Sequence, residues 1–513
     1  MVTTREREAG AAVEANRGAA AIIAGFLAAR LAFAATLGFG TDEAYTVPIA
    51  RNLALSYFDH PPLHQWIAHF AAMAFGETVA ARIPFVALFA ATGWLVFAMT
   101  RDLFGGRAGL VALFALNVTP FFFTSAGTWI VPDGPLIFGL ALAGWALARV
   151  LFGPGAGEAR IWGLWLVAGM GFGLAGLSKY IAALTALGLL GFLLASPQAR
   201  RWFRHPAPYA AGALAVAMIL PVLAWNARHG WVSFAFQGAR SVASPGLNPL
   251  EIVRVALEQV AYLFPWIFIA LAAGLVAGLR LWRDDRRLFL LCLSLPPIVF
   301  FTISPLWVDR GMPHWAMPGW LFAFPLMGAW VEDAAIPVRR LRTYAILSVV
   351  LLAALIAGAA VEARTGWLVR VLPAGAADPT LEAFGWDGLR QAPLLQPPPA
   401  FVISVGWAEA GKIALALGPD VPVFVVSYDP RGWAFEPKRP DLVGRDGALV
   451  VAAKDLPVVR PVLAPLFASL GEAEPFTLTR NGAPAVELML VPARGLKALL
   501  PLPYPPMARP VND

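Results

Sequence analysis

The stretch AAAIIAGFLAARLAFAATLGF at residues 19–39 has a single charged residue, Arg30, among its 21 positions. A helix of roughly 20 apolar residues is long enough to cross the ~30 Å hydrocarbon layer of a membrane. Stretches of the same kind recur along the 513-residue chain, which is 59% apolar and 14% charged. A soluble domain carries about 25% charged residues. The sequence therefore predicts a polytopic α-helical membrane protein.

Short polar connections separate these apolar stretches into about eleven candidate transmembrane helices. Arg30 lies inside the first of them, where an unpaired charge costs about 2.5–3.5 kcal/mol, so we expect its side chain to face protein. The candidate spans are 19–39, 79–99, 108–124, 134–152, 161–177, 180–196, 207–225, 253–279, 288–304, 315–331 and 343–362.

Arginines concentrate in every second connection, which is the positive-inside pattern of a chain with a cytoplasmic N-terminal segment. Loops beside anionic lipid account for the net charge of +7 better than a continuous basic face would, so we expect no nucleic acid partner. The arginines concerned are Arg5, Arg7 and Arg17, then Arg101 and Arg107, Arg160, Arg200, Arg201 and Arg204, Arg280, Arg283, Arg286 and Arg287, and Arg339, Arg340 and Arg342.

The segment after the last span has a different composition. It contains the β-rich runs FVISVG (401–406), VPVFVVS (421–427) and ALVVAA (448–453), together with a helix-like AEAGKIALALG (408–418) and Pro-rich connectors. This pattern predicts a small α/β domain on the periplasmic side. The expected organisation is a cytoplasmic segment 1–18, a transmembrane domain 19–362 and a periplasmic domain 363–513.

The first outward loop, 40–78, is unusually long and apolar. After its double proline, a helical arrangement places apolar side chains on one face and polar side chains toward another, as in a helix that lies in the membrane interface. We therefore expect this loop to stay at the bilayer surface. The apolar set is Leu63, Trp66, Ile67, Phe70 and Ala74, and the polar set is His64, Gln65 and His69.

Acidic residues gather on the same predicted membrane face. Asp42 and Glu43 open the loop, and because neighbouring residues of a helix point about 100° apart, we expect only one of the two, Asp42, to act on a substrate. Asp59 precedes the double proline, which restricts the backbone, and Asp133 lies at the outward end of the fourth span. The competing interpretation is that these acids are solvated loop residues or helix caps.

Asp59 is followed by His60, and a carboxylate beside an imidazole could also ligate a divalent cation such as Mg, Mn or Zn. Two adjacent residues make a poor metal site unless distant residues supply further ligands. No other cofactor is expected.

Five motifs stand out in the first 330 residues or so: DEAY (42–45), SYFDHPPL (56–63), PDGPL (132–136), GLSKY (176–180) and MPHWAMPGW (312–320). Together they resemble the dolichyl-phosphate-mannose protein mannosyltransferase superfamily, the family 39-like enzymes of GT-C fold, to which the aminoarabinose transferases of lipid A are related. Before the double proline this sequence has Asp59 and His60, where the aminoarabinose branch carries Glu and Lys, which argues against aminoarabinose as the sugar.

The resemblance implies a polyprenyl-phosphate sugar donor, an outward-facing site and inversion at the anomeric carbon. It also implies that Asp42 is the general base that takes the proton of the acceptor hydroxyl. The departing lipid phosphate needs positive charge around its oxygens, and Lys179 in the outward turn after the fifth span could supply it unless it only reaches to the interface. Further substrate-binding candidates are His60, Tyr180, Arg240, Arg310 and His314.

These residues favour a glycosyltransferase of the inner membrane that acts on lipid A or lipopolysaccharide, another glycolipid or a protein. The main alternative is a transporter or flippase for a lipid-linked sugar, which would place charges deep in several spans and break its helices. A purely structural membrane scaffold would need no acids beside a rigid double proline.

The arginine alternation makes a testable prediction of topology. Reporters fused within residues 40–78 or in the C-terminal domain should be active outside the cytoplasm, and reporters within 100–107, 197–206 and 280–287 should be active inside it. A cytoplasmic C-terminal domain would remove one span and contradict the predicted orientation.

Overall fold

The computed structural model describes residues 4–155, 157–240, 248–308, 311–367 and 378–499. The chain divides into two compact units. The bundle unit consists of Met1–Ala32, Leu55–His64 and Arg82–Ala354, and the C-terminal unit of Phe33–Ala54, Gln65–Ala81 and Leu355–Asp513. The first outward loop is thus divided between the two.

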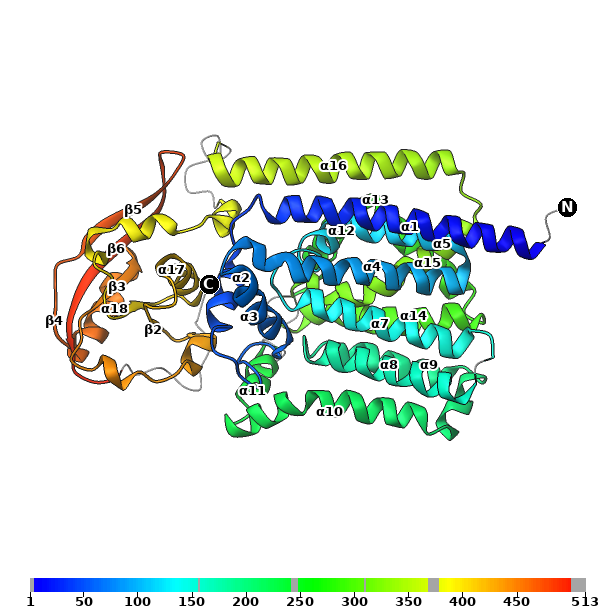
Figure 1. Ribbon diagram of the computed structural model, residues 1–513, viewed down its shortest axis with the longest axis horizontal. Coiled ribbons are helices and arrows are strands. Elements are labelled where there is room, and N and C mark those ends of the chain that lie inside the picture. The colour runs from blue at the N-terminus through cyan, green and yellow to red at the C-terminus, as the bar shows by residue number, and fades with distance from the viewer. Residues whose placement is uncertain (1–3, 156, 241–247, 309–310, 368–377, 500–513) are drawn as a thin grey trace. The chain divides into compact units, whose positions relative to one another are not determined.

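Long apolar helices that lie side by side form the bundle unit (Figure 1). Small residues allow their backbones to approach closely, as is common between membrane helices. The helices are α1 (Thr4–Ala34), α4 (Ile83–Phe104), α5 (Gly106–Val118), α6 (Pro120–Phe123), α7 (Asp133–Phe152), α8 (Glu158–Gly176), α9 (Ala182–Ala195), α10 (Ala207–Arg228), α11 (Val232–Ala239), α12 (Pro249–Leu263), α13 (Pro265–Arg280), α14 (Asp285–Ile303), α15 (Met317–Asp333) and α16 (Val338–Thr365), the last of which continues into the C-terminal unit.

The polytopic helical fold predicted from the sequence is confirmed, and a helix is found at each predicted span. Among the described residues, seven helices are long and apolar enough to cross a membrane, or eight if one bent pair is a single span. Helices α5, α9 and α15 coincide with predicted spans but have only 13, 14 and 17 residues. The predicted count of about eleven spans therefore stays a prediction.

The predicted span at 253–279 is sharply bent in the structure. Helices α12 and α13 meet at an angle of 103° around Phe264, whose φ is +60°. Pro265 follows, and a proline disfavours helical backbone at the residue before it, so the helix ends and restarts at this point. Helix α12 is amphipathic, with exposed Leu250 and Leu257 and with Arg254 bonded to acidic side chains of its own turns.

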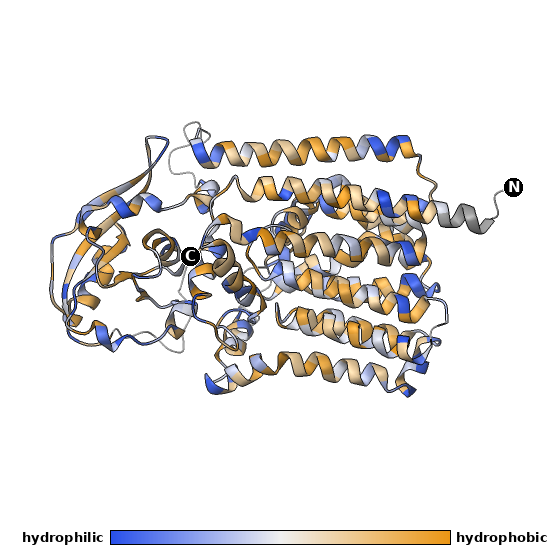
Figure 2. Ribbon diagram, in the orientation of Figure 1, coloured by the Kyte–Doolittle hydropathy of each residue, from blue (hydrophilic) through white to orange (hydrophobic). Residues whose placement is uncertain are grey.

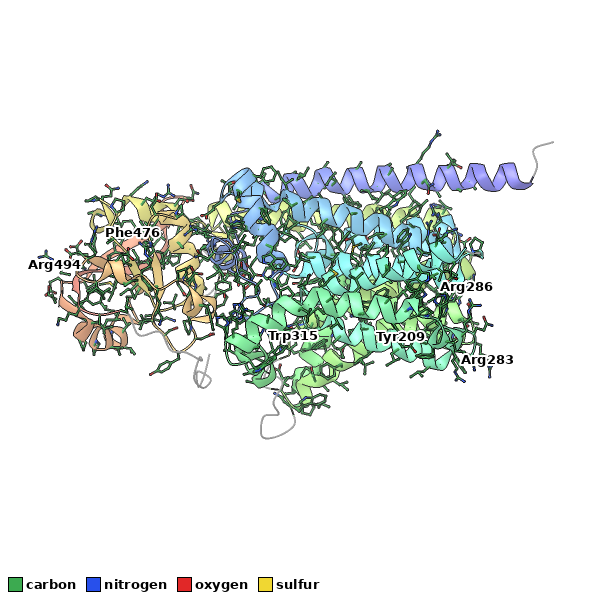
Figure 3. The ribbon with its side chains drawn as sticks, turned by 60° about the horizontal axis from the view of Figure 1, so that its bottom comes forward. Tyr209, Arg283, Arg286, Trp315, Phe476 and Arg494 are labelled. Atoms are coloured by element: carbon green, nitrogen blue, oxygen red, sulfur yellow. The ribbon has the colours of Figure 1, made fainter. Side chains whose placement is uncertain are left out.

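One end of the bundle unit is rich in arginine. Arg149 bonds Asp102 at 2.8 Å, and Arg287 bonds Asp333 at 2.7 Å, which places the ends of α4, α7, α14 and α15 together. Figure 2 shows hydrophilic residues at these helix ends and apolar residues between, and Figure 3 shows Arg283 and Arg286 at this end and Trp315 toward the opposite one. We call it the arginine-rich end.

Arg30 is buried in the bundle as expected. Its guanidinium donates to the side-chain oxygen of Asn117 at 2.8 Å and stacks over the Phe89 ring at 4.4 Å from the ring centre. A hydrogen bond and a cation–π contact together offset the cost of a charge at this depth. Arg30 is therefore a structural residue of the helix packing.

The C-terminal unit contains a six-stranded sheet in the order β2-β1-β3-β6-β4, with β5 also paired to β6. The predicted β-rich runs and helix are present as the parallel strands β1, β3 and β2 and as α17, whereas the antiparallel strands β4 to β6 were not predicted. The elements are β1 (Val402–Ser404), α17 (Trp407–Leu417), β2 (Val423–Val425), β3 (Gly447–Ala452), α18 (Leu456–Leu463), β4 (Phe467–Leu470), β5 (Glu474–Arg480) and β6 (Ala483–Leu496).

The same unit includes α2 (Thr41–Ile49) and most of α3 (Leu63–Phe75) from the first outward loop. Helix α3 has the amphipathic character that the sequence predicts, because Phe70 and Met73 are 61% and 73% exposed while Gln65 is buried. An exposed apolar face beside buried polar residues is typical of a helix that rests on a membrane surface.

Candidate active site

A buried ion pair joins two of the five motifs in the bundle unit. The Lys179 ammonium donates to both carboxylate oxygens of Asp133, at 2.8 and 3.0 Å, and both side chains are less than 10% exposed. Asp133 begins α7, and Lys179 follows the end of α8. Lys179 is therefore held inside the protein and does not extend to the interface.

Close packing of α7 against α8 sets the position of this pair. A Cβ atom on Gly139 of α7 would lie 2.6 Å from the Gly171 carbonyl oxygen of α8, closer than real Cβ atoms approach. Glycine at these positions lets the two backbones touch. As a result, the end of α8 comes within hydrogen-bond reach of the start of α7.

The loop that carries FDHPPL is held against the same place. The Leu63 amide donates to the Leu177 carbonyl oxygen at 2.9 Å, which joins FDHPPL to GLSKY. Gln237 of α11 donates to the backbone carbonyl of Asp59 at 2.6 Å, and the Phe58 ring packs on the Phe236 ring at 4.7 Å. Helix α11 thus fixes the backbone before the double proline, and Asp59 is buried there.

Two histidines lie within electrostatic range of the ion pair. The pKa of His64 is lowered to about 3 and that of His314 to about 4, mainly by burial and then by the nearby Lys179 ammonium, while the Asp133 carboxylate acts in the opposite direction. Both imidazoles are therefore neutral at pH 7 and present one donor and one acceptor nitrogen each. The His60 ring meets the His64 ring edge to face at 5.8 Å.

Tyr180 and Arg240 border this cluster. The Tyr180 ring packs on the Phe234 ring of α11, with 5.2 Å between the ring centres. The Arg240 guanidinium lies over the Trp315 ring at 5.4 Å from the ring centre, beside His314 of MPHWAMPGW. Arg310, another predicted candidate, lies outside the described residues.

The DEAY motif lies in the C-terminal unit, at the start of α2. Glu43 is buried, and its carboxylate accepts from the Gly40 amide at 2.9 Å, which caps the helix. The Tyr45 hydroxyl accepts from the Gly432 amide at 2.8 Å, and its ring packs on Trp407 at 5.3 Å. Asp42 is exposed, in contrast to both.

Helix α17 supports the DEAY helix from the C-terminal domain. A Cβ atom on Gly411 would overlap the Ala44 carbonyl oxygen, so α17 packs on α2 backbone to backbone. Next to Gly411, the buried Lys412 ammonium donates to the carbonyl oxygens of Phe39 and Glu382, at 2.5 and 2.6 Å. It also donates to that of Phe384 at 3.2 Å.

Charges of both signs gather around Lys412. Although the Glu382 side chain is exposed by area, partial desolvation and the nearby Asp42 carboxylate raise its pKa, and the Lys412 ammonium lowers it. Lys412 therefore joins α17 to the backbone at Phe39 and to the segment of Glu382 and Phe384. The Asp42 and Glu382 carboxylates lie nearby. Sequence analysis missed this residue, because a lysine in a helix of the C-terminal domain carries no pattern that points to DEAY.

Comparisons with known proteins show relatives of the same fold. Two crystal structures of ArnT from Cupriavidus metallidurans, apo and bound to undecaprenyl phosphate, share the fold with a TM-score of 0.60 each. They are 19% and 17% identical to this chain, and cover 91% and 92% of it and 97% of their own length. Residues 59–225 match the family model described as dolichyl-phosphate-mannose-protein mannosyltransferase. The chain is thus similar to this family over residues 59–225 and shares its fold with ArnT.

The chain is also similar to the lipid A galacturonosyltransferase RgtD from Rhizobium johnstonii, with 28% identity over 305 residues. The match covers 57% of this chain and 60% of the relative, so it spans less than two thirds of that protein. The region matched by the family model begins at Asp59 and includes Asp133 and Lys179. PDGPL and GLSKY lie within the matched region, and SYFDHPPL lies partly within it.

Metal binding by Asp59 and His60 gains no support from their surroundings. Within the described ranges, no group of three or more His, Cys, Asp and Glu side chains is placed to hold a metal ion. The Asp59 and His60 pair therefore lacks the distant ligands that the sequence-based hypothesis required.

Of the predicted site residues, Asp59, His60, Asp133, Lys179, Tyr180, Arg240 and His314 lie in the bundle unit, and Asp42 and Glu43 in the C-terminal unit. Asp133, predicted as a catalytic acid, is the ion-pair partner of Lys179. Glu43 caps a helix. The sequence missed His64 as a site residue, because its amphipathic position suggested only a polar helix face.

Lys412 provides a test of how the DEAY helix is held. Lys412→Met should lower the free energy of unfolding by about 1–3 kcal/mol, because three buried carbonyl groups lose their donor. Thermal unfolding of the purified protein in detergent would measure this. Lys454→Met is the matched control, since Lys454 is an exposed lysine of the same domain. Equal loss in the two variants would contradict the structural role of Lys412.

Proposed function

We propose that this protein is an inverting glycosyltransferase that moves a sugar from a polyprenyl-phosphate donor to an envelope acceptor at the outer face of the inner membrane. The observation that supports this function most strongly is the cluster around the Lys179 and Asp133 ion pair, in which GLSKY, PDGPL, FDHPPL and MPHWAMPGW come together. These motifs lie far apart in the sequence, and family 39-like proteins share them.

Lys179 is the residue that we assign to the donor phosphate. A lysine ammonium has three N–H donors, and Asp133 accepts from it through both carboxylate oxygens. The remaining donor can reach a phosphate oxygen while Asp133 holds the ammonium in place. A fixed positive charge stabilises the departing phosphate more as negative charge develops on the leaving oxygen. A lipid phosphate is a weak base and needs no general acid.

Asp42 is the residue that we assign as general base. The acceptor hydroxyl must lose its proton as its oxygen attacks the anomeric carbon, and a carboxylate can take that proton. Of the two acids in DEAY, Glu43 is buried and bonded to the Gly40 amide, while Asp42 is exposed at the first turn of α2. Direct attack on the anomeric carbon, with the phosphate leaving from the opposite side, inverts that carbon.

The neutral imidazole of His314 suits the sugar. It has one donor and one acceptor nitrogen, which is the pairing that sugar hydroxyl groups require, and its side chain is partly exposed. Relatives indicate the general class of the donor and of the acceptor. RgtD is named for transfer of galacturonic acid to lipid A, and an ArnT structure contains undecaprenyl phosphate. We therefore propose an undecaprenyl-type donor and a lipid A, glycolipid or protein acceptor.

A transporter or flippase for a lipid-linked sugar is the alternative to transfer. Transporters use broken helices at membrane depth, and the bend between α12 and α13 is a break. However, α12 is amphipathic, and its Glu251 and Glu258 both bond Arg254, with all three side chains partly exposed. These are features of a surface helix, so the bend does not favour transport.

The first prediction concerns the general base. Asp42→Asn should lower turnover by about 10²–10⁴-fold and leave donor binding unchanged, because the amide keeps the size of the side chain but cannot accept a proton. Single-turnover transfer with purified protein and a polyprenyl-phosphate sugar would measure it. Glu43→Gln is the control, since an amide oxygen can still accept from Gly40, and its effect should be much smaller. An Asp42→Asn variant with wild-type turnover would exclude this mechanism.

The second prediction separates phosphate binding from charge balance at Lys179. Lys179→Ala should lower turnover by about 10²–10³-fold and weaken binding of the polyprenyl-phosphate product. Lys179→Arg should recover only part of the activity, since a guanidinium keeps the charge but not the compact geometry.

Loss of folding is a separate effect, because Lys179→Ala leaves the Asp133 carboxylate buried without its partner. The double variant Lys179→Ala with Asp133→Ala removes both charges and should recover stability in thermal unfolding. If Lys179 binds the phosphate, the double variant stays inactive. Recovered turnover in the double variant would show that Lys179 only neutralises Asp133.

A further inference from the structure

An apolar groove with a volume of about 670 Å³ runs along α16 in the bundle unit. Its walls come from α1, α5, α13, α15 and α16, and include Phe114, Trp266 and Met327. This volume is in the range of ordinary small-molecule sites, which span about 300–1,000 Å³. Helix α16 lies along the outside of the bundle (Figure 1), and most of its apolar side chains are exposed.

Two arginines line the groove near the first turns of α16. Arg340 and Arg342 are both exposed, and neither guanidinium forms an ion pair with an acid in the described part of the chain. Acids nearby already have arginine partners, because Glu332 bonds Arg107 and Asp333 bonds Arg287. The groove therefore combines a long apolar wall with positive charge that is left for a ligand.

The arginines also fix the orientation of a ligand. Arg107 donates to the Ile336 carbonyl oxygen, so the start of α16 lies at the arginine-rich end of the bundle. Ser348, which accepts from Trp266 at 2.8 Å, is eight residues after Arg340, or about 12 Å along the helix. The positive charge is thus at the membrane surface, and the apolar wall extends from it toward the membrane interior.

We propose that this groove binds one anionic phospholipid, with its phosphate at Arg340 and Arg342 and an acyl chain against α13, α15 and α16. Guanidinium groups bind phosphate oxygens well, and basic pockets between membrane helices at the positive-inside face suit anionic head groups. Helix α16 then packs on the bundle through lipid as well as through side chains.

This lipid is distinct from the donor in the proposed transfer reaction. Asp133 begins α7, and Arg149 near the end of that helix bonds Asp102 at the arginine-rich end. Sixteen residues of α-helix separate the two, or about 24 Å. A donor whose phosphate meets Lys179 therefore has its head group at the opposite end of the bundle from Arg340 and Arg342.

The test is lipid retention by the purified full-length protein. The protein is reconstituted in nanodiscs of phosphatidylcholine with a minor share of phosphatidylglycerol, re-extracted in mild detergent and analysed by native mass spectrometry. Wild-type protein should keep about one phosphatidylglycerol per chain. The double variant Arg340→Gln with Arg342→Gln should keep at least tenfold less, because both phosphate contacts are lost.

Arg280→Gln with Arg283→Gln is the matched control, since these exposed arginines lie outside the groove and removing them takes away the same charge. It should retain the lipid as the wild type does. A third variant, Ala345→Phe, fills the groove and keeps both arginines, and it should also lose the lipid. Equal retention in all variants, equal loss in the control, or no preference for phosphatidylglycerol over phosphatidylcholine would each overturn the proposal. Thermal unfolding of every variant confirms that the compared proteins are folded.

Discussion

The Lys179 and Asp133 ion pair is the interaction on which the bundle site depends. Burying two charges away from water is costly, and a carboxylate left without its partner is costlier still, so the two side chains must meet. They meet because glycines in α7 and α8 let the helix backbones touch. The pair then fixes the turn after α8, to which the Leu63 amide, and with it the double proline, is bonded. A single electrostatic requirement thus brings three distant motifs to one place.

A different constraint governs the DEAY helix. Three of the four DEAY residues have structural contacts: Glu43 caps the helix, the Ala44 backbone packs directly on Gly411 of α17, and Tyr45 packs among aromatic residues of the C-terminal domain. These contacts leave Asp42 exposed on a helix that is held firmly. The C-terminal domain, whose role could not be read from its sequence pattern, therefore supports the helix that carries the proposed base.

The sequence was sufficient to predict those helices and strands that follow directly from hydropathy and residue type. Long apolar runs predicted the helices, and β-branched runs predicted β1 to β3. Two features were not predicted because prolines change the local structure. Pro265 interrupts a continuous apolar run and separates α12 from α13. Pro484 and Pro492 lie within β6, and because prolines are rare in strands, the sequence did not indicate this strand. In the site, the acids and Lys179 could be recognised as candidates by residue type and position. The contacts that they make could not be predicted, because the pairs Asp133 with Lys179 and Lys412 with Phe39 join segments that are distant in sequence.

The central claim is that this protein transfers a sugar from a lipid carrier to an envelope molecule. The most direct measurement is mass spectrometry of the envelope glycolipids, glycoproteins and polyprenyl-phosphate sugars of a deletion strain, compared with the same strain complemented by the gene. Our account predicts that one sugar is missing from one acceptor, that the corresponding polyprenyl-phosphate sugar accumulates, and that complementation reverses both changes. An unchanged set of envelope sugars, with no accumulated donor, would contradict it.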